Sequence, residues 1–198
     1  MNDGALMRCA WAGATPAMRD YHDREWGTPQ HDDRTLLEFV VLEGAQAGLS
    51  WRTILDRREA YRRAYHGFDI ERVAAMADDE LETLLQSGAI IRNRLKVYSA
   101  RSNARAALAA IGAHGSLDAY LWSLAGGRPI INRWTEPGQV PARTEVSDRM
   151  SKELRKHGFN FVGSTICYAL MQATGMVNDH LVSCFRHTSG CSPAPAGA

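Results

Sequence analysis

The stretch "NDHLVSC", residues 178–184, places a histidine and a cysteine four residues apart, at His180 and Cys184. Side chains at i and i+4 lie on one face of a helical turn, so this imidazole and thiol could bind one metal ion. Structural zinc takes four protein ligands, and two cysteines with two histidines is a common set. Cys9 in "RCAW" and His22 in "YHDREWG" could complete it.

Spacing alone leaves two other interpretations of this pair open. His187 and Cys191 repeat the same spacing seven residues later. Buried cysteines also serve as small hydrophobic side chains, and a lone histidine is more often packed or exposed than metal-bound. A Cys₂His₂ site that joins the two ends of the chain is therefore one hypothesis among three.

A carboxylate inside an apolar pattern is the second candidate for chemistry. In "LLEFVVLEGAQAGLSW", Glu43 falls on the same helical stripe as Leu36, Phe39 and Val40, because seven residues return to within about 20° of the starting direction. A buried glutamate is rare unless it is paired. The alternative is that the helix ends near Gly44 and leaves Glu43 in water.

Aromatic residues surround these candidates in the sequence. Trp11, Tyr21 and Trp26 lie near the N-terminal metal candidates, and Trp51 follows Glu43. Ring faces attract a cation by about 0.5–2 kcal/mol each, and a carboxylate adds negative charge and hydrogen-bond acceptors. Glu43 with several rings therefore predicts a pocket for a flat cation. The alternative is that the rings are ordinary core residues.

Composition places the chain among ordinary globular proteins. It has 198 residues, a net charge of +1 and 45% hydrophobic residues, which indicates one domain. No apolar run reaches the roughly 18–20 residues that cross a bilayer, and the N-terminus lacks the pattern of a secretory signal. We expect a cytoplasmic protein with no membrane partner, one domain over residues 1–190 and a disordered tail at 191–198.

Apolar periodicity and capping residues predict an all-α fold of seven or eight helices with no clear sheet. Residues 126–146 contain three prolines and are predicted to be a loop. A long helix is predicted over about 93–112, and a last apolar helix over "GSTICYALMQAT". The residues expected to start the other helices are Asp33, Asp69, a capping box of Asp79 and Glu82, Ser116 and Ser147, and those expected to end them are Gly88, Gly126–Gly127, Gly158 and Gly175.

Four long motifs together resemble one protein family. "RCAW", "YHDREWG", "LEGAQAGLSW" and "FVGSTICYALMQATGMVNDH" closely resemble the bacterial type I 3-methyladenine DNA glycosylases, from about Cys9 to Cys184. The resemblance implies an all-α helix-hairpin-helix glycosylase fold, with a structural zinc joining the N- and C-terminal segments. By motif, the implied zinc ligands are Cys9, His22, His180 and Cys184. His187 and Cys191 lie outside the matched region, which disfavours that pair.

The resemblance also implies the activity and the base pocket. We expect a monomeric, monofunctional enzyme that flips 3-methyladenine out of alkylated double-stranded DNA and removes it by hydrolysis. Glu43 would be the catalytic and base-binding carboxylate, with Trp11, Tyr21 and Trp51 as the aromatic walls. Met18 departs from the family pattern, because an aromatic residue is expected there.

DNA contacts are implied at two places in the chain. Gly48 and Leu49, in "AGLS", would probe the gap left by the flipped nucleotide. The segment "LLQSGAIIRNRLK" would form the hairpin, whose backbone N–H groups can bind a phosphate. Arg92, Arg94 and Lys96 are the candidate phosphate contacts, or else part of a solvated face.

Three competing functions remain at this point. A non-catalytic, zinc-stabilised DNA-binding module would need neither Glu43 nor a pocket. A lyase would need an amine that forms a Schiff base, for which Lys96 is the candidate. A zinc hydrolase is disfavoured, because four protein ligands leave no open position for water.

Overall fold

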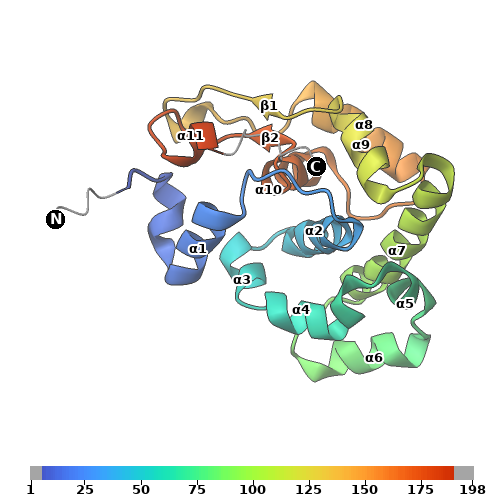
Figure 1. Ribbon diagram of the computed structural model, residues 1–198. Coiled ribbons are helices and arrows are strands. Elements are labelled where there is room, and N and C mark those ends of the chain that lie inside the picture. The colour runs from blue at the N-terminus through green and yellow to red at the C-terminus, as the bar shows by residue number, and fades with distance from the viewer. Residues whose placement is uncertain (1–5, 190–198) are drawn as a thin grey trace, which may run out of the picture.

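The computed structural model describes residues 6–189, and this part of the chain is almost entirely helical, as predicted (Figure 1). Residues 191–198, predicted to be a disordered tail, and Cys191 lie outside the described residues. No helix within residues 6–189 is long and apolar enough to cross a bilayer. The elements in chain order are η1 (Ala10–Ala14), α1 (Pro16–Arg24), α2 (Asp33–Gln46), α3 (Trp51–Leu55), α4 (Arg58–Ala64), η2 (His66–Phe68), α5 (Ile70–Ala75), α6 (Asp78–Ser87), α7 (Arg94–His114), α8 (Leu117–Ala125), β1 (Ile130–Ile131), η3 (Pro137–Gln139), α9 (Glu145–Lys156), α10 (Ser164–Ala173), β2 (Val177–Asn178) and α11 (Arg186–Ser189).

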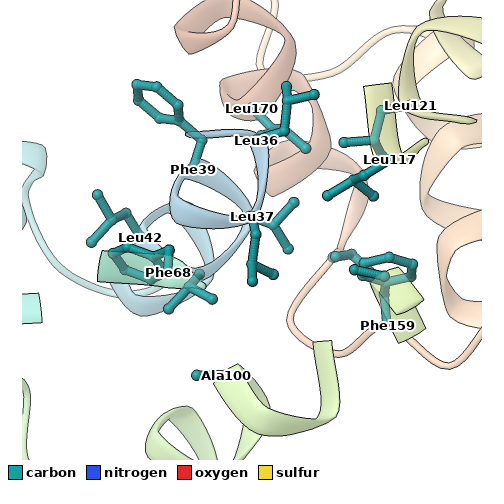
Figure 2. Close-up of a cluster of buried hydrophobic side chains, with 14 of the residues drawn as sticks. Leu36, Leu37, Phe39, Leu42, Phe68, Ala100, Leu117, Leu121, Phe159 and Leu170 are labelled. Atoms are coloured by element: carbon teal, nitrogen blue, oxygen red, sulfur yellow. The ribbon is translucent and has the colours of Figure 1, made fainter. Parts of the chain in front are cut away.

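Helix α2 lies at the centre of the molecule and packs against α7, α8 and α10. From Leu36 to Ala45 all of its residues are buried, so it has no polar face over this length, which is the pattern of a core helix. Figure 2 shows its leucine and phenylalanine side chains surrounded by apolar residues from the neighbouring elements. Any polar residue in this part of α2 is therefore held inside the protein.

Several helix ends were predicted correctly from the capping residues in the sequence. The side chains of Asp69 and Ser116 accept hydrogen bonds from the backbone N–H groups of Arg72 at 3.1 Å and Ala119 at 2.9 Å. Gly88 ends α6 in the left-handed conformation with φ of +68°, where a side chain would be strained. The link between α6 and α7 is therefore the short hairpin turn that the sequence predicts.

The predicted capping box of Asp79 and Glu82 is wrong. Helix α6 begins one residue earlier than Asp79, and Ala77 takes the N-cap position. The backbone N–H of Ala77 donates to the Glu80 carboxylate at 3.4 Å. Three successive acidic residues begin this helix, and each is favourable near a helix N-terminus, so the sequence offers several starts of similar quality.

Ser147 was predicted to cap α9, and this is also wrong. Thr144 is the N-cap, and its backbone N–H donates to the Ser147 hydroxyl at 2.9 Å. The backbone N–H of Ser147 donates in return to the Thr144 hydroxyl at 3.3 Å. The two hydroxyl residues form a reciprocal box, in which either could have been taken for the cap.

Three short helices that carry site residues were not predicted. Helix α1 bears Tyr21 and His22, α3 begins at Trp51, and α4 follows it. Helix α3 spans only five residues, which is too short for a periodic pattern to be read. A start signal for α1 was present, because the Thr15 hydroxyl accepts from the Met18 N–H at 3.2 Å and Pro16 follows it.

The two ends of the described chain are brought together by the backbone. Figure 1 shows α1 on the same side of the molecule as the C-terminal segment that contains α11. The Gly27 N–H donates to the Gln172 carbonyl, and the Gln30 N–H donates to the Thr174 carbonyl, both at 3.0 Å. Strands β1 and β2 form a parallel pair in which Ile130 is opposite Val177. The Gly27 and Gln30 contacts would hold the N-terminal segment in place with or without a metal.

Gly175 is the closest point of this junction, and Gly175→Ala is expected to destabilise the protein by about 3 kcal/mol. An added Cβ would lie 2.3 Å from backbone atoms of Thr28 and Pro29, and the φ of +71° disfavours any side chain. Urea unfolding measures the change. Gly112→Ala is the matched control, since a Cβ there meets open space inside α7. Equal stability of the two variants would contradict the prediction.

Candidate functional site

Four residues from the two ends of the chain converge on one buried point. Cys9, His22, His180 and Cys184 are all buried, and their ligand atoms lie within 4.8 Å of one another. The Cys184 Sγ is 3.4 Å from His22 Nε2 and 3.5 Å from His180 Nδ1, and the Cys9 Sγ is 3.7 Å from His180 Nδ1. These are the four residues that the resemblance selects, and the cluster could hold a metal ion.

The hydrogen bonds outside the cluster fix the imidazole orientations. His22 Nδ1 lies 2.8 Å from the Asp23 carboxylate, and His180 Nε2 lies 3.0 Å from the Trp26 carbonyl. Because a carboxylate and a carbonyl only accept, those two nitrogens carry the protons. The other nitrogens, His22 Nε2 and His180 Nδ1, then direct lone pairs into the cluster, which is the usual arrangement of metal-binding histidines.

Burial changes the protonation of the cluster. It lowers the pKa of His180 to about 4 and also lowers the pKa of His22, so both imidazoles are neutral at pH 7. It raises the pKa of the Cys9 thiol to about 12. Neutral imidazoles are ready to bind a metal, whereas a buried thiolate needs a nearby cation to be stable.

Only His187 of the rival pair lies within the described residues. His187 is buried, and its Nε2 lies 2.9 Å from the Asn132 carbonyl. Its proposed partner Cys191 falls outside the residues that the structure describes. His187 therefore has a role in packing the loop before η3 against the C-terminal segment.

Aromatic rings connect this cluster to a cavity. The Trp26 ring packs edge-on against His180, with centroids 4.6 Å apart, and the Trp11 ring packs edge-on against His22 at 5.2 Å. Trp11 and Trp26 contact each other at 5.0 Å. The cluster therefore supports both tryptophans directly.

The cavity has a volume of about 240 Å³ and combines aromatic walls with few polar groups. The predicted residues Trp11, Tyr21, Glu43 and Trp51 all line it. Tyr21 lies 5.1 Å from Trp51 and 6.3 Å from Trp11 between ring centroids. The structure therefore assembles in one place the aromatic residues and the carboxylate that the sequence singled out.

Glu43 supplies the carboxyl group that lines this cavity. It is 4% exposed, which rules out the alternative that it lies at the wet end of its helix, and α2 continues to Gln46. No residue within 6–189 forms a hydrogen bond or ion pair with its carboxyl group. Burial raises the pKa of Glu43 to about 8, so a neutral carboxyl predominates at pH 7 until a cation enters.

The cavity also holds Met18 and Trp26, which the sequence analysis named, and two glutamines that it missed. Met18, at the position that departs from the family pattern, is buried and lines the cavity together with Trp11 and Tyr21. Trp26, Gln46 and Gln172 also line the cavity. The sequence held one usable signal, because Gln46 lies three residues after Glu43 and so faces the same side of α2.

Trp51 and Gln172, which line the cavity, each carry a polar group. The buried Nε1 of Trp51 has no acceptor among the described residues. The Gln172 amide nitrogen donates to the Asp179 carboxylate at 2.8 Å, and this same carboxylate accepts from Tyr168 at 2.6 Å and Trp134 at 2.7 Å. Asp179, in the "NDHLVSC" stretch, thereby fixes the amide orientation of Gln172.

An ion-pair network positions the helix that bears Tyr21. Arg58 of α4 is buried and pairs with Glu38 of α2 and with Glu25, just after α1, at 2.6 Å each. Arg62 also pairs with Glu38 at 2.8 Å. These contacts hold α1 against α2, so Tyr21 and Glu43 reach the same cavity from two helices.

The residues predicted to enter DNA lie beside the cavity. Gly48 and Leu49 line a second hollow of about 180 Å³, which shares Glu43 and Gln46 with the first. Leu49 is 40% exposed, unusual for a large apolar side chain in this protein. Gly48 has φ of +77°, a backbone conformation that favours glycine over residues with a side chain.

The three basic candidates of the hairpin have different surroundings. Arg92 is exposed and has no hydrogen bond or ion pair within residues 6–189. Arg94 is exposed, pairs with Glu82 and lies over the Tyr98 ring at 4.6 Å. Lys96 is half-buried and donates to two backbone carbonyls.

Known proteins match almost the whole chain. The methyladenine glycosylase family matches residues 11–187. DNA-3-methyladenine glycosylase 1 of Escherichia coli (strain K12) is 45% identical over 179 residues, which cover 90% of this chain and 96% of that protein.

Solved structures agree with the sequence comparison. A crystal structure of a 3-methyladenine DNA glycosylase I superposes with a TM-score of 0.87 at 47% identity, covering 94% of this chain and 100% of the other. A variant of a 3-methyladenine DNA glycosylase I in complex with 3-methyladenine also gives 0.87, at 31% identity, covering 90% of this chain and 96% of the other. The predicted fold is confirmed.

Proposed function

This chain belongs to the methyladenine glycosylase family, and we propose that the cavity around Glu43 is where it removes 3-methyladenine from DNA. The enzyme is a DNA-3-methyladenine glycosylase of base-excision repair. One observation carries the assignment of the site: several aromatic rings line one cavity with a buried carboxyl group that has no partner among the described residues. A flat, cationic base is the ligand that such a cavity fits.

The substrate explains why the site needs so few reactive groups. A base inside a duplex must be rotated out of the stack before an enzyme can reach its bond to the sugar. 3-Methyladenine carries a positive charge while attached and leaves as a neutral base, so it departs without strong general-acid help. Water then takes its place at C1′. The cavity therefore acts mainly by selecting and holding the flipped base.

Glu43 would select the base by charge. The cation that enters favours the ionised carboxylate, which then accepts hydrogen bonds from the adenine edge. Trp11, Tyr21 and Trp51 would stack on the base, and such stacking contributes about 1–3 kcal/mol per base. Unmodified adenine is neutral and gains less from the carboxylate.

DNA would be held by the hairpin and the loop beside the cavity. Gly48 and Leu49 would occupy the space that the flipped nucleotide leaves. Arg92 and Arg94 would contact phosphates, and Arg92 has no competing partner among the described residues. Lys96, the third predicted contact, has its ammonium group already bound to two backbone carbonyls.

Zinc is the metal that we propose for the Cys9, His22, His180 and Cys184 cluster. With bonds of about 2.3 Å to sulfur and 2.0–2.1 Å to nitrogen, a tetrahedral zinc ion separates neighbouring sulfur and nitrogen ligands by roughly 3.5 Å. Three of the four sulfur–nitrogen distances in the cluster, 3.4, 3.5 and 3.7 Å, fit this value. Four protein ligands leave no position for a reacting water, so the ion would be structural.

Release of free base tests the proposed function. We expect the purified protein to release 3-methyladenine from methylated double-stranded DNA, as measured by chromatography of the ethanol-soluble fraction. Backbone cleavage without added alkali, or a covalent adduct trapped by borohydride, would instead indicate a lyase. Binding to DNA without base release would contradict the assignment.

A further inference from the structure

Lys96 lies where a helix leaves backbone carbonyls without partners. Its Nζ donates to the Ala45 carbonyl at 2.9 Å and to the Ala47 carbonyl at 2.6 Å. Helix α2 ends at Gln46, and the last carbonyls of a helix have no partner inside it. An ammonium group at that end also faces the negative pole of the helix dipole. Lys96, which belongs to α7 and lies 51 residues further along the chain than Ala45, thus caps the C-terminal end of α2.

The cap extends into the loop of residues 47–50, here called the gap loop. Its own backbone supplies two bonds, from the Ala47 N–H to the Gly44 carbonyl at 3.4 Å and from the Leu49 N–H to the Gln46 carbonyl at 2.6 Å. Within the described residues, Lys96 is the one side chain from outside α2 and α3 that hydrogen-bonds to this loop. Removing it would leave the turn held only by local contacts.

The gap loop lies between the cavity and the proposed DNA surface. Gly48 and Leu49 line the hollow that shares Glu43 with the base cavity, and Glu43 precedes Ala45 by two residues. Lys96 belongs to the first turn of α7, where the Asn93 side chain accepts from its backbone N–H at 3.1 Å. One residue therefore connects the hairpin, the gap loop and the end of the helix that bears Glu43.

We propose that Lys96 is a positioning residue, which holds the gap loop and the end of α2 in the geometry needed for excision, and that it does not act as a phosphate contact. The inference rests on the proposed function of Glu43 and Leu49. Its ammonium group directs hydrogen bonds at two carbonyls, whereas Arg92 on the same hairpin has no partner within residues 6–189. The hairpin would thereby set the loop before DNA arrives.

Three variants separate positioning from phosphate binding. Lys96→Met removes the cap, Lys96→Arg keeps two donors, and Lys152→Met removes the same charge from an exposed position on α9. We expect Lys96→Met to lower the single-turnover excision rate at saturating methylated DNA by about tenfold to a hundredfold, as for a misplaced catalytic geometry. Lys96→Arg should recover most of the rate, and Lys152→Met should match the wild type.

DNA affinity and amide exchange supply the discriminating measurements. For Lys96→Met we expect an unchanged slope of log Kd against log salt and faster hydrogen exchange at the Leu49 amide. A lost phosphate contact would instead reduce that slope by about 0.9 and leave the rate at saturation unchanged, which would overturn the proposal. Unchanged exchange and rate would also overturn it.

If Lys96→Met does not fold, amide exchange is compared in two other variants. Lys96→Arg keeps donors for the two carbonyls, and Gly48→Ala places a side chain at the positive φ of the gap loop. We expect slower exchange of the gap-loop amides, Leu49 included, in Lys96→Arg than in Gly48→Ala, and equal exchange would contradict the proposal. Absence of base release by the wild type would refute the proposed function separately.

Discussion

Replacing Glu43 with glutamine is expected to lower 3-methyladenine excision by about 100-fold or more. The amide keeps the size of the side chain and one acceptor oxygen, but it cannot become negative when the cationic base enters the cavity. The electrostatic contribution is large there because the carboxyl group is buried and has no partner among the described residues. Single-turnover release of the free base from methylated DNA measures the effect.

The same variant is expected to gain stability at neutral pH. Burial raises the pKa of Glu43 from 4.5 to about 8. Below pH 4.5 the carboxyl is protonated in both states and costs no stability. Between these two pKa values the unfolded chain ionises while the native protein stays protonated, so the stability contributed by Glu43 falls as pH rises through about 8. Glutamine removes this penalty, a gain of about 2–4 kcal/mol at pH 8 that vanishes near pH 4.

The pH dependence of wild-type excision is a second test of the ionisation of Glu43. If the ionised form of Glu43 is required, kcat/KM should rise with pH and level off above about 8, since kcat/KM reports the pKa values of the free enzyme. The glutamine variant should lack that rise. Glu71→Gln is the control, because it makes the same chemical change on the exposed surface of α5. Wild-type excision by Glu43→Gln would refute the assignment of Glu43.

The position of Glu43 shows what periodicity alone can predict. A repeat of seven placed it on the apolar stripe of α2, and the structure confirms that it is buried. Periodicity could not decide whether the helix stopped at Gly44, because the end of α2 also makes contacts with distant residues such as Lys96, 51 residues away along the chain. Contacts over that separation leave no local pattern in a sequence.

The metal candidates show a different limit of prediction from the sequence. Spacing suggested His180 and Cys184 as well as His187, and only the resemblance selected one set. The structure brings the selected residues together, because the Gly27–Gln172 and Gln30–Thr174 backbone contacts hold the two ends of the chain side by side. The caps of α6 and α9 were mispredicted for a local reason, since each start offers several competent residues within four positions.

Replacing Cys184 with alanine is expected to abolish tight zinc binding and to lower the free energy of unfolding by on the order of 5 kcal/mol. For a domain of this size, such a loss corresponds to a decrease of roughly 10–20 °C in Tm. Metal analysis of the purified variant and thermal unfolding measure the two effects. A zinc chelator should destabilise the wild type in the same way and leave the variant unchanged.

Cys167→Ala is the control that separates metal loss from the loss of a buried side chain. Cys167 is also fully buried, but its thiol donates to the Val162 carbonyl at 3.3 Å and lies outside the cluster. We expect this variant to keep its zinc and to lose about 1 kcal/mol. Full zinc content in Cys184→Ala would refute the ligand set. Because Trp26 packs against His180 and Trp11 against His22, loss of the metal should also weaken binding of the free base 3-methyladenine, whereas Cys167→Ala should leave that binding intact.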